Sequence, residues 1–379
     1  MSNNTANLLV LPGDGVGPEV LEQCLRVVEW FSTHRGLAVN IQKEVIGGAS
    51  IDLHGVPIQE SVLAKARDSD AILFGAVGGE KWDNLPVLQR PEAAILALRG
   101  DLDLYANVRP AKCYETLTEF STLKASVVAN LDLVIVREGT SGVYFGKPRA
   151  IEIAENGEEI AYDTQYYSTS EIDRVCRFAF DLARTRQGKL CSVDKANVME
   201  TGALWRKVFN NVAKDYPDVA ISHMYADNCA MQLVRNPQQF DVIVTDNLFG
   251  DILSDCAAML TGSLGMLPSA SIGALRADGR RHALYEPVHG SAPDIAGCGI
   301  ANPLAMILSF AMCLRLSLDR PSDAADLEQA VENVLSNGIM TADLCTDKQI
   351  PTGTVEMGDA IIEALNRIDL LQKNGEPLQ

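Results

Sequence analysis

The residues best suited to chemistry lie in the segment 245–255, which reads TDNLFGDILSD. Asp251 and Asp255 are four residues apart, so a helix would carry both carboxylates on one face. Like charges at this spacing destabilise a helix by about 0.2–0.5 kcal/mol, unless water or a cation separates them. Oxygen ligands without histidine or cysteine suit a hard ion such as Mg²⁺ or Mn²⁺. Taken alone, a segment of this kind is more often a solvated acidic helix face than a metal site.

The elements around this segment explain how the acids would be positioned. An apolar run at 241–244 predicts a buried strand, and the residues after it predict a helix that continues through Leu260. Asp246 lies at the start of that helix, where the helix dipole favours a negative charge. The acids are therefore expected at a turn from strand to helix.

Other charged residues occupy the same kind of position, at the end of an apolar run. Three further predicted strands end in this way: 131–136 before Arg137, 189–193 before Lys195 and 219–225 before Asp227. Ligands of open α/β sheets bind at the carboxyl ends of the strands. Arginine binds carboxylates in a planar, two-pronged manner, so Arg99, Arg109 and Arg137 point to a polycarboxylate substrate chelated to a metal.

The rest of the chain alternates predicted strands with predicted helices, which is typical of an α/β layered fold. The predicted strands are 8–11, 39–46, 71–76 and 282–285, and the predicted helices are 18–32, 60–68, 92–99 and 170–186. Gly100 is expected to cap the third of these helices. The turn at 13–17 lacks the spacing of a dinucleotide-binding fingerprint. The segment 142–167 alternates polar and apolar residues like a hairpin arm that packs on a partner.

Length and composition limit the classes of protein. A chain of 379 residues predicts two domains, and a net charge of −18 argues against nucleic acid or an anionic membrane as a partner. Nine scattered cysteines without a C-x-x-C motif favour free thiols in a reducing compartment. The first residues resemble no targeting sequence, and no apolar run reaches 18 residues, so we expect a cytoplasmic protein that does not contact a membrane.

Eleven blocks, in order along residues 8–370, resemble the isocitrate/isopropylmalate family of metal-dependent β-decarboxylating dehydrogenases. They are LPGDGVGPE (11–19), GAVGGEKWD (75–83), RPEAAILALR (90–99), YANVRP (105–110), VRE (136–138), GVYFG (142–146), DKANV (194–198), YADN (225–228), TDNLFGDILSD (245–255), GSLGMLPSAS (262–271) and EPVHGSAPDIAG (286–297). The ordered series is far more specific than any single block.

The resemblance implies a fold of two interleaved α/β domains that share a central mixed sheet, without a Rossmann fingerprint. The first, cofactor-side domain would comprise residues 1–104 and 262–379, and the second 105–261, with a dimer-interface arm at about 142–167. A homodimer with shared active sites is implied, in which Lys195 and Asp227 reach the site from the partner subunit.

The resemblance also implies a role for individual residues. Asp251, Asp255 and Asp227 would bind Mg²⁺ or Mn²⁺, and Tyr144 and Lys195 would be the catalytic acid–base pair. Arg99, Arg109 and Arg137, together with Asp227, would bind the substrate. The NAD site would comprise Glu286, His289, Gly290, Ser291, Ala292, Asp294, Ile295 and Asn302. Asp294 would accept hydrogen bonds from the ribose hydroxyls and so favour NAD over NADP.

The apolar pair Ile95 and Leu96 separates the alternatives within the family. These side chains would form a pocket for an isopropyl group, which favours 3-isopropylmalate, an intermediate of leucine biosynthesis, over tartrate, malate, homoisocitrate or isocitrate. Other 3-alkylmalates remain open as substrates. The chain departs from commoner family residues at 139–141 and at Cys256, beside the predicted ligands. A catalytically silent regulatory subunit is a rival from another class, although none of the catalytic or metal-binding residues is missing.

Overall fold

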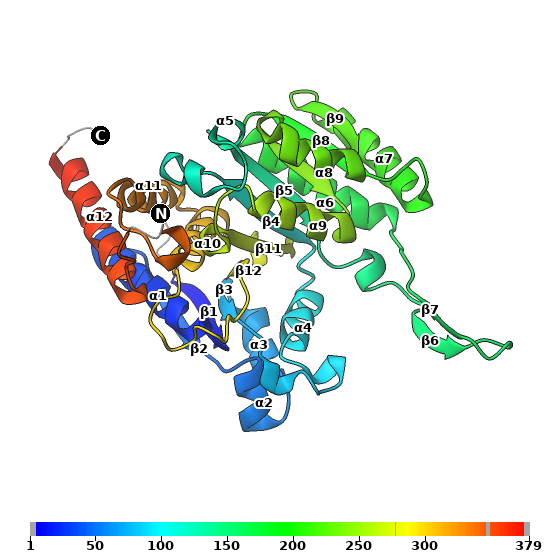
Figure 1. Ribbon diagram of the computed structural model, residues 1–379, viewed down its shortest axis with the longest axis horizontal. Helices are drawn as coiled ribbons and strands as arrows, with labels where there is room; N and C mark the ends of the chain where they lie inside the picture. Colours follow the sequence, from blue (N-terminus) through cyan, green and yellow to red (C-terminus); the bar gives the residue numbers. More distant parts are fainter. Residues whose placement is uncertain (1–4, 277, 346–348, 375–379) are drawn as a thin grey trace. The chain divides into compact units, whose positions relative to one another are not determined.

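The computed structural model describes residues 5–276, 278–345 and 349–374. The chain forms two compact units, one of Met1–Asp103 with Gly262–Gln379 and the other of Leu104–Thr261. In both units helices pack on a mixed β-sheet (Figure 1). The α/β fold class predicted from the alternation of strands and helices is therefore confirmed.

The strands of the first unit follow the order β2-β1-β3-β12-β11. Neighbours in this order are parallel except for β11 and β12, which are antiparallel. The strands are β1 (Ala6–Gly13), β2 (Val39–Lys43), β3 (Ala71–Ala76), β11 (Pro268–Leu275) and β12 (Arg281–Pro287). The helices are α1 (Gly17–Arg35), α2 (Gly48–His54), α3 (Glu60–Asp68), α4 (Ala93–Asp101), α10 (Leu304–Leu316), α11 (Pro321–Ser336) and α12 (Thr354–Asn374).

Helix α10 is the central helix of this unit. Its residues from Leu304 to Leu314 are all buried, and it packs against β11, β12, α1 and α11. A helix surrounded in this way needs apolar side chains on every face, which explains the sequence LAMILSFAMCLRL. Helix α12 packs on α1 and α11 and has a polar outer face.

The strands of the second unit follow the order β4-β5-β10-β8-β9. Strand β4 is antiparallel to β5, and the other neighbours are parallel. The strands are β4 (Ala106–Lys112), β5 (Asp132–Glu138), β8 (Lys189–Asp194), β9 (Ala220–Tyr225) and β10 (Val242–Thr245). The helices are α5 (Ala125–Val128), α6 (Thr169–Arg184), α7 (Glu200–Val212), α8 (Ala226–Arg235) and α9 (Asn247–Ala258).

One core of this unit lies between the sheet and helices α8 and α9. Leu133 and Ile135 of β5 and Ile243 of β10 pack there against Leu253 and Ala257 of α9. Side chains alternate between the two faces of a strand, so the residue two places after Ile135 also points towards α9. The alternate residues of these strands face α6, which contacts β5, β8 and β10.

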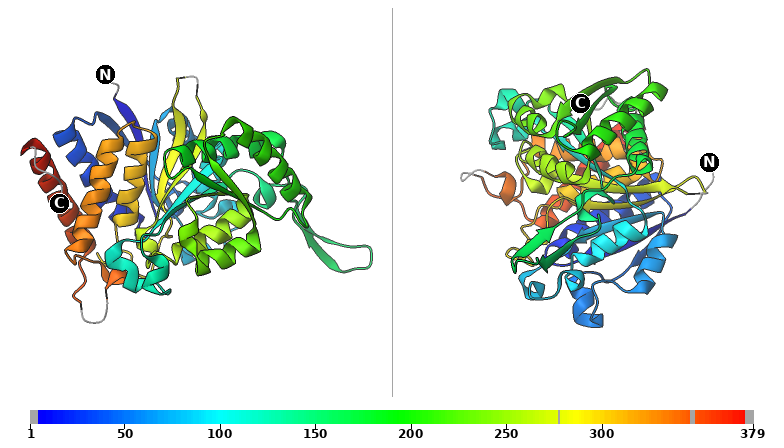
Figure 2. Two further views of the ribbon diagram at one scale, coloured as in Figure 1. Left: turned by 90° about the horizontal axis from the view of Figure 1, so that it is seen from above. Right: turned by 90° about the vertical axis from the view of Figure 1, so that its right-hand side faces the viewer.

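The predicted arm is an antiparallel hairpin of β6 (Ala150–Ile153) and β7 (Glu159–Tyr162). It projects beyond the helices of its own unit (Figures 1 and 2). Ile151 and Ile153 are 76% and 73% exposed, which is unusual for isoleucine on a strand. A short 3₁₀ turn, η4 (Gly142–Tyr144), lies at the base of the arm.

Most predicted elements agree with the structure within a few residues, and helix 60–68 and strand 71–76 agree at both ends. Gly100 does not cap α4, so that prediction is wrong. The helix continues through Asp101, and the left-handed conformation is adopted by Asp103, at φ 47°. The nine cysteines are free thiols. Within the described residues, no helix is long and apolar enough to cross a membrane.

Candidate active site

Helix α9 aligns four polar side chains on one stripe. Asn247, Asp251, Ser254 and Asp255 follow the helical spacing of three or four residues. Asp246 caps the helix, because its side chain accepts a hydrogen bond from the backbone N–H of Phe249. The predicted turn from strand to helix is therefore present, and Asp246 is the N-cap residue of α9.

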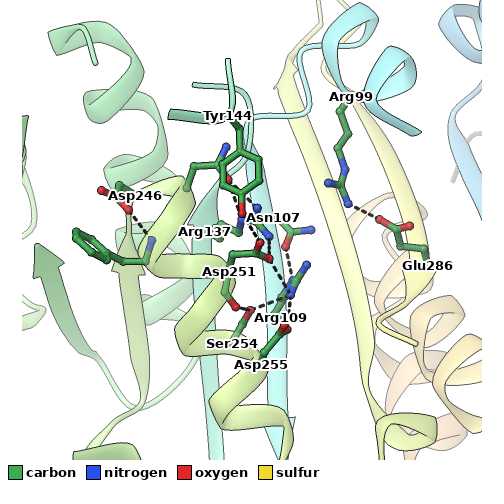
Figure 3. A network of polar contacts seen from close by, with 12 residues as sticks. Arg99, Asn107, Arg109, Arg137, Tyr144, Asp246, Asp251, Ser254, Asp255 and Glu286 are labelled. Carbon is green, nitrogen blue, oxygen red and sulfur yellow. Dashed lines mark hydrogen bonds and ion pairs between the residues drawn. The ribbon is translucent and has the colours of Figure 1, made fainter. Parts of the chain in front are cut away.

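The strands beneath α9 present two of the predicted arginines to this stripe. Arg137 follows Ile135 by two residues on β5, and Arg109 on β4 lies opposite Ile135 in the register. Both side chains therefore extend from the α9 face of the sheet. Gly250 permits the close approach, since a Cβ atom there would lie 2.6 Å from Cγ of Arg137. Figure 3 shows the two guanidinium groups directed at the acids.

The two arginines bind the predicted metal-binding acids in this structure. Arg137 Nη1 donates to Asp251 Oδ1. Arg109 Nη1 donates to Ser254 Oγ at 2.8 Å and to Asp255 Oδ1 at 3.2 Å, and it lies 3.8 Å from Asp251 Oδ1. The side chain of Asp255 is 69% exposed and that of Asp251 is 31% exposed, whereas that of Arg137 is 8% exposed. The two carboxylates are thus accessible to solvent, whereas the guanidinium group of Arg137 that contacts Asp251 is buried.

Tyr144 belongs to the same cluster. Its hydroxyl donates to Asp251 Oδ2 at 2.7 Å, and its ring centroid lies 5.4 Å from the guanidinium carbon of Arg137 (Figure 3). The hydrogen bond to Asp251 raises the pKa of Tyr144, as do partial burial and the charge of Asp251. The phenol is therefore protonated at neutral pH, which is the state that a proton donor requires.

Two buried residues beneath the cluster were not singled out from the sequence. Asn247 accepts hydrogen bonds from Arg137 Nε and Nη2 at 3.0 and 2.7 Å. Glu138, on the opposite face of β5, accepts hydrogen bonds from Thr140 and Ser141 in the turn that leads to Tyr144. Asn247 lies one helical turn before Asp251, and this spacing is the signal in the sequence that could have indicated its place beside the acids.

Lys195 and Asp227 form a separate pair in the second unit. Lys195 Nζ donates to Asp227 Oδ1 at 2.5 Å, which lowers the pKa of Asp227. The turn beneath them is held by the buried Asp194, which accepts two hydrogen bonds from Arg206 at 2.8 and 2.9 Å. The Lys195 ammonium lies 5.8 Å from the ring centroid of Tyr225. The two residues thus come together as an exposed ion pair.

The donor set of Asp251 and Asp255 fits a hard divalent cation. Both are carboxylates on one helix face, and each accepts a hydrogen bond from a guanidinium group in this structure. Across the described parts of the chain, no three His, Cys, Asp or Glu side chains are grouped to hold a metal. Among these described residues, Asp227 is therefore not grouped with Asp251 and Asp255.

The first unit carries the remaining predicted substrate residues on α4. Ile95 and Arg99 are one helical turn apart, and Leu96, next to Ile95, is 42% exposed. Arg99 Nη2 donates to Glu286 Oε1 of β12 at 2.8 Å (Figure 3). A residue predicted to bind substrate and one predicted to bind the cofactor are therefore paired with each other.

The predicted cofactor residues follow β12 in a loop of the same unit. His289 Nδ1 contacts the carbonyl of Gly290 at 2.9 Å, and burial lowers the pKa of His289, so its ring is neutral. Its Nε2 is buried and has no hydrogen-bond partner among the described residues. An unpaired buried nitrogen of this kind fits a polar ligand such as a nucleotide base.

The other predicted cofactor residues lie in this loop or follow it along the chain. Gly290 has no atom within 4 Å of where a Cβ would lie, and Ala292 adopts a positive φ of 38°. Asp294 is exposed and Ile295 is partly exposed. Ser291, through its carbonyl, accepts from the N–H of Val16 at 2.8 Å. Asn302 is held by Asp343, to which its Nδ2 donates at 3.0 Å.

Comparison with protein-family models assigns residues 7–361 to the isocitrate/isopropylmalate dehydrogenase family. A 3-isopropylmalate dehydrogenase of Ruegeria pomeroyi is 59% identical over 97% of this chain and 99% of its own length. One of Gluconobacter oxydans is 58% identical over 95% of this chain and 98% of its own length.

Solved structures resemble the chain over nearly its whole length. An isocitrate dehydrogenase of Methylococcus capsulatus superposes with a TM-score of 0.81 at 37% identity, covering 95% of this chain and 99% of that one. A beta-decarboxylating dehydrogenase of Thermococcus kodakarensis in its apo form gives 0.78 at 35% identity, covering 99% and 100%.

Proposed function

Because the chain belongs to the isocitrate/isopropylmalate dehydrogenase family, we propose that it catalyses NAD-dependent oxidative decarboxylation of (2R,3S)-3-isopropylmalate to 4-methyl-2-oxopentanoate and CO₂. It is a decarboxylating dehydrogenase, and the reaction belongs to leucine biosynthesis. The observation in the structure that best supports this activity is the α9 stripe, where two acids meet two arginines and a protonated tyrosine.

The substrate carries two carboxylates, which matches the pair of arginines beneath α9 in the second unit. Arg109 and Arg137 extend from adjacent strands on one sheet face, so they can bind the substrate together. In our proposal Arg99 adds a third guanidinium group once it leaves Glu286, with which it pairs in this structure. Ile95 and Leu96 would contact the isopropyl group.

The divalent cation would be held by Asp251 and Asp255, with Asp227 from a partner subunit as the third acid. When bound, the cation stabilises negative charge on substrate oxygens and NAD accepts the hydride. In this proposal, Lys195 of the partner removes the proton of the 2-hydroxyl. Tyr144 donates its phenolic proton to the carbon that CO₂ leaves, and its hydrogen bond to Asp251 keeps that proton in place beforehand.

The NAD preference rests on the charge of Asp294. An exposed carboxylate at this position would accept hydrogen bonds from the ribose hydroxyls and repel the 2′-phosphate of NADP. The free thiols of the chain accord with work in the reducing cytoplasm, which we include in the proposal.

The proposal is tested by steady-state kinetics of the purified protein with 3-isopropylmalate, malate, tartrate, isocitrate and homoisocitrate. We expect kcat/KM to be highest for 3-isopropylmalate and to be much higher with NAD than with NADP. A chelator should abolish turnover, and Mn²⁺ or Mg²⁺ should restore it. Full activity without metal, or a higher kcat/KM for malate, would refute the assigned site. Absence of turnover with every substrate would favour a regulatory subunit.

A further inference from the structure

Asn247 lies at the point where the parts of the candidate active site meet. Its side chain is 1% exposed at the first turn of α9, one turn before Asp251. Its Oδ1 accepts from Arg137 Nε and Nη2, and its Nδ2 donates to the carbonyl of Ser141 at 3.0 Å. Its backbone N–H donates to the hydroxyl of Tyr167 at 2.9 Å.

The orientation of this amide follows from its partners. A guanidinium group carries only donors, so the oxygen of Asn247 must face Arg137. The carbonyl of Ser141 is an acceptor, so the amide nitrogen must face it. Asparagine carries the acceptor for one neighbour and the donor for the other on separate atoms, and it carries no charge.

These contacts determine where two functional groups lie. With Nε and Nη2 held by Asn247, the remaining terminal nitrogen of Arg137 points to Asp251. Ser141 immediately precedes the turn η4 that carries Tyr144. One amide therefore links the arginine, the tyrosine turn and the helix of the metal-binding acids.

We propose that Asn247 is a positioning residue that fixes the Arg137 guanidinium group for the substrate carboxylate without neutralising it. A neutral amide orients the arginine without adding a second ion pair to the one that Arg137 forms with Asp251. An aspartate at the same place would still accept from Arg137, but it would lose the donor to the Ser141 carbonyl and add an ion pair that competes with the substrate. The inference rests on the proposed function, since it gives Arg137 a substrate to bind.

The test compares Asn247→Ala and the isosteric Asn247→Asp with the wild type. We expect Asn247→Ala to raise the KM for 3-isopropylmalate by roughly tenfold to a hundredfold, because hydrogen bonds to a charged group are lost. The KM for NAD should stay within about twofold of wild type if the effect passes through Arg137. Asn247→Asp should also raise the substrate KM, through charge competition, even if Asn247→Ala fails to fold.

A double-mutant cycle with Arg137→Lys separates positioning from general stability. Lysine lacks the Nε and Nη2 donors, so adding Asn247→Ala to Arg137→Lys should reduce kcat/KM by less than about threefold further. Asn366→Ala is the matched control, because Asn366 accepts from Trp30 Nε1 at 2.7 Å in the other unit. That variant should keep the wild-type KM for both ligands.

The outcomes distinguish the two proposals. If the wild type oxidises 3-isopropylmalate but the Asn247 and Arg137 effects multiply, Asn247 does not act through Arg137 and the inference is wrong. Equal increases in the KM of substrate and NAD, or a wild-type substrate KM in Asn247→Asp, would overturn it as well. If the wild type does not oxidise 3-isopropylmalate, the proposed function fails first.

Discussion

Individual residues of the second unit show how one strand serves two purposes. Arg137 and Glu138 are adjacent on β5 and therefore point to opposite faces of the sheet. Arg137 faces α9 and the candidate active site, whereas Glu138 is fully buried with Thr140, Ser141 and Tyr167 as hydrogen-bond partners. The buried carboxyl group of Glu138 thus stabilises the turn that leads to Tyr144. The free-energy cost of burying it depends on whether it is ionised.

Glu138 predicts a pH dependence of stability. Burial raises its pKa from 4.5 to about 7, although hydrogen bonds from Thr140 and Ser141 lower it. The folded state therefore binds a proton that the unfolded chain releases between about pH 4.5 and 7, so this residue destabilises the protein as pH rises through that window. Its ionisation costs on the order of 3 kcal/mol above pH 7.

The variant Glu138→Gln removes this titration. Its free energy of unfolding, measured by urea denaturation, should rise relative to that of the wild type between pH 5 and pH 8. Asp246, whose pKa burial raises to about 6, is present in both proteins and cancels in the comparison. A constant difference between the two proteins across this range would contradict the assignment.

Leu96 predicts substrate preference at the same scale. Leu96 lies on α4 about one helical turn before Arg99, and 42% of it is exposed. Its side chain is therefore available to contact an isopropyl group. Leu96→Asn should reduce the ratio of kcat/KM for 3-isopropylmalate over malate by about tenfold or more, at roughly 0.8 kcal/mol per buried carbon. Leu370→Asn, on the exposed face of α12, should leave this ratio unchanged. An unchanged ratio in Leu96→Asn would exclude this residue from the pocket.

Among the elements, the β6–β7 hairpin stands apart from the packed layers. A two-stranded hairpin is marginally stable alone, and this one exposes Ile151 and Ile153 on a single face. The proposed homodimer supplies a reason for both features, since a second copy would cover the isoleucines.

The double variant Ile151→Lys with Ile153→Lys should therefore weaken the dimer. Buried lysines at a subunit contact are unfavourable, so sedimentation velocity at micromolar concentration should detect monomer, and specific activity should fall on dilution. Leu53→Lys, at a site on α2 that is 66% exposed, is the control and should sediment like the wild type. A fully dimeric double variant would place the dimer contact elsewhere.

At the scale of the whole molecule, the described residues place the proposed catalytic side chains in two groups. Arg109, Tyr144 and Asp251 belong to the α9 cluster, whereas Lys195 contacts Asp227. In a two-fold dimer each site could combine the α9 cluster of one subunit with the Lys195 pair of the other. This arrangement predicts complementation between inactive variants.

Lys195→Ala and Asp251→Ala should each be nearly inactive but should recover activity when co-expressed. One site of a mixed dimer is then intact and the other carries both defects. Random pairing makes roughly half of the dimers mixed, so up to about a quarter of wild-type activity is expected. Arg109→Ala with Asp251→Ala is the matched control, because both residues belong to one cluster and no intact site can form. Mixed dimers of the first pair that stay inactive would place each site within one chain.

Local patterns in the sequence determined much of this protein. Helix 60–68, strand 71–76 and the one-turn spacing of Asp251 and Asp255 follow from periodicity and helix geometry, which depend only on neighbouring residues. The ordered family motifs identified the family and its reaction, and the comparisons confirmed both. The roles of the individual site residues stay predictions.

Tertiary structure decided which distant residues meet. Arg99 pairs with Glu286 across 187 positions, and Arg137 with Asn247 across 110. Such contacts depend on strand order and register, which no local pattern encodes. The same reason explains Gly100: its type favours a helix end, but helix α4 continues through it and ends after Asp101. Local preference is worth about 1 kcal/mol at such a position, and packing of the surrounding elements outweighs it.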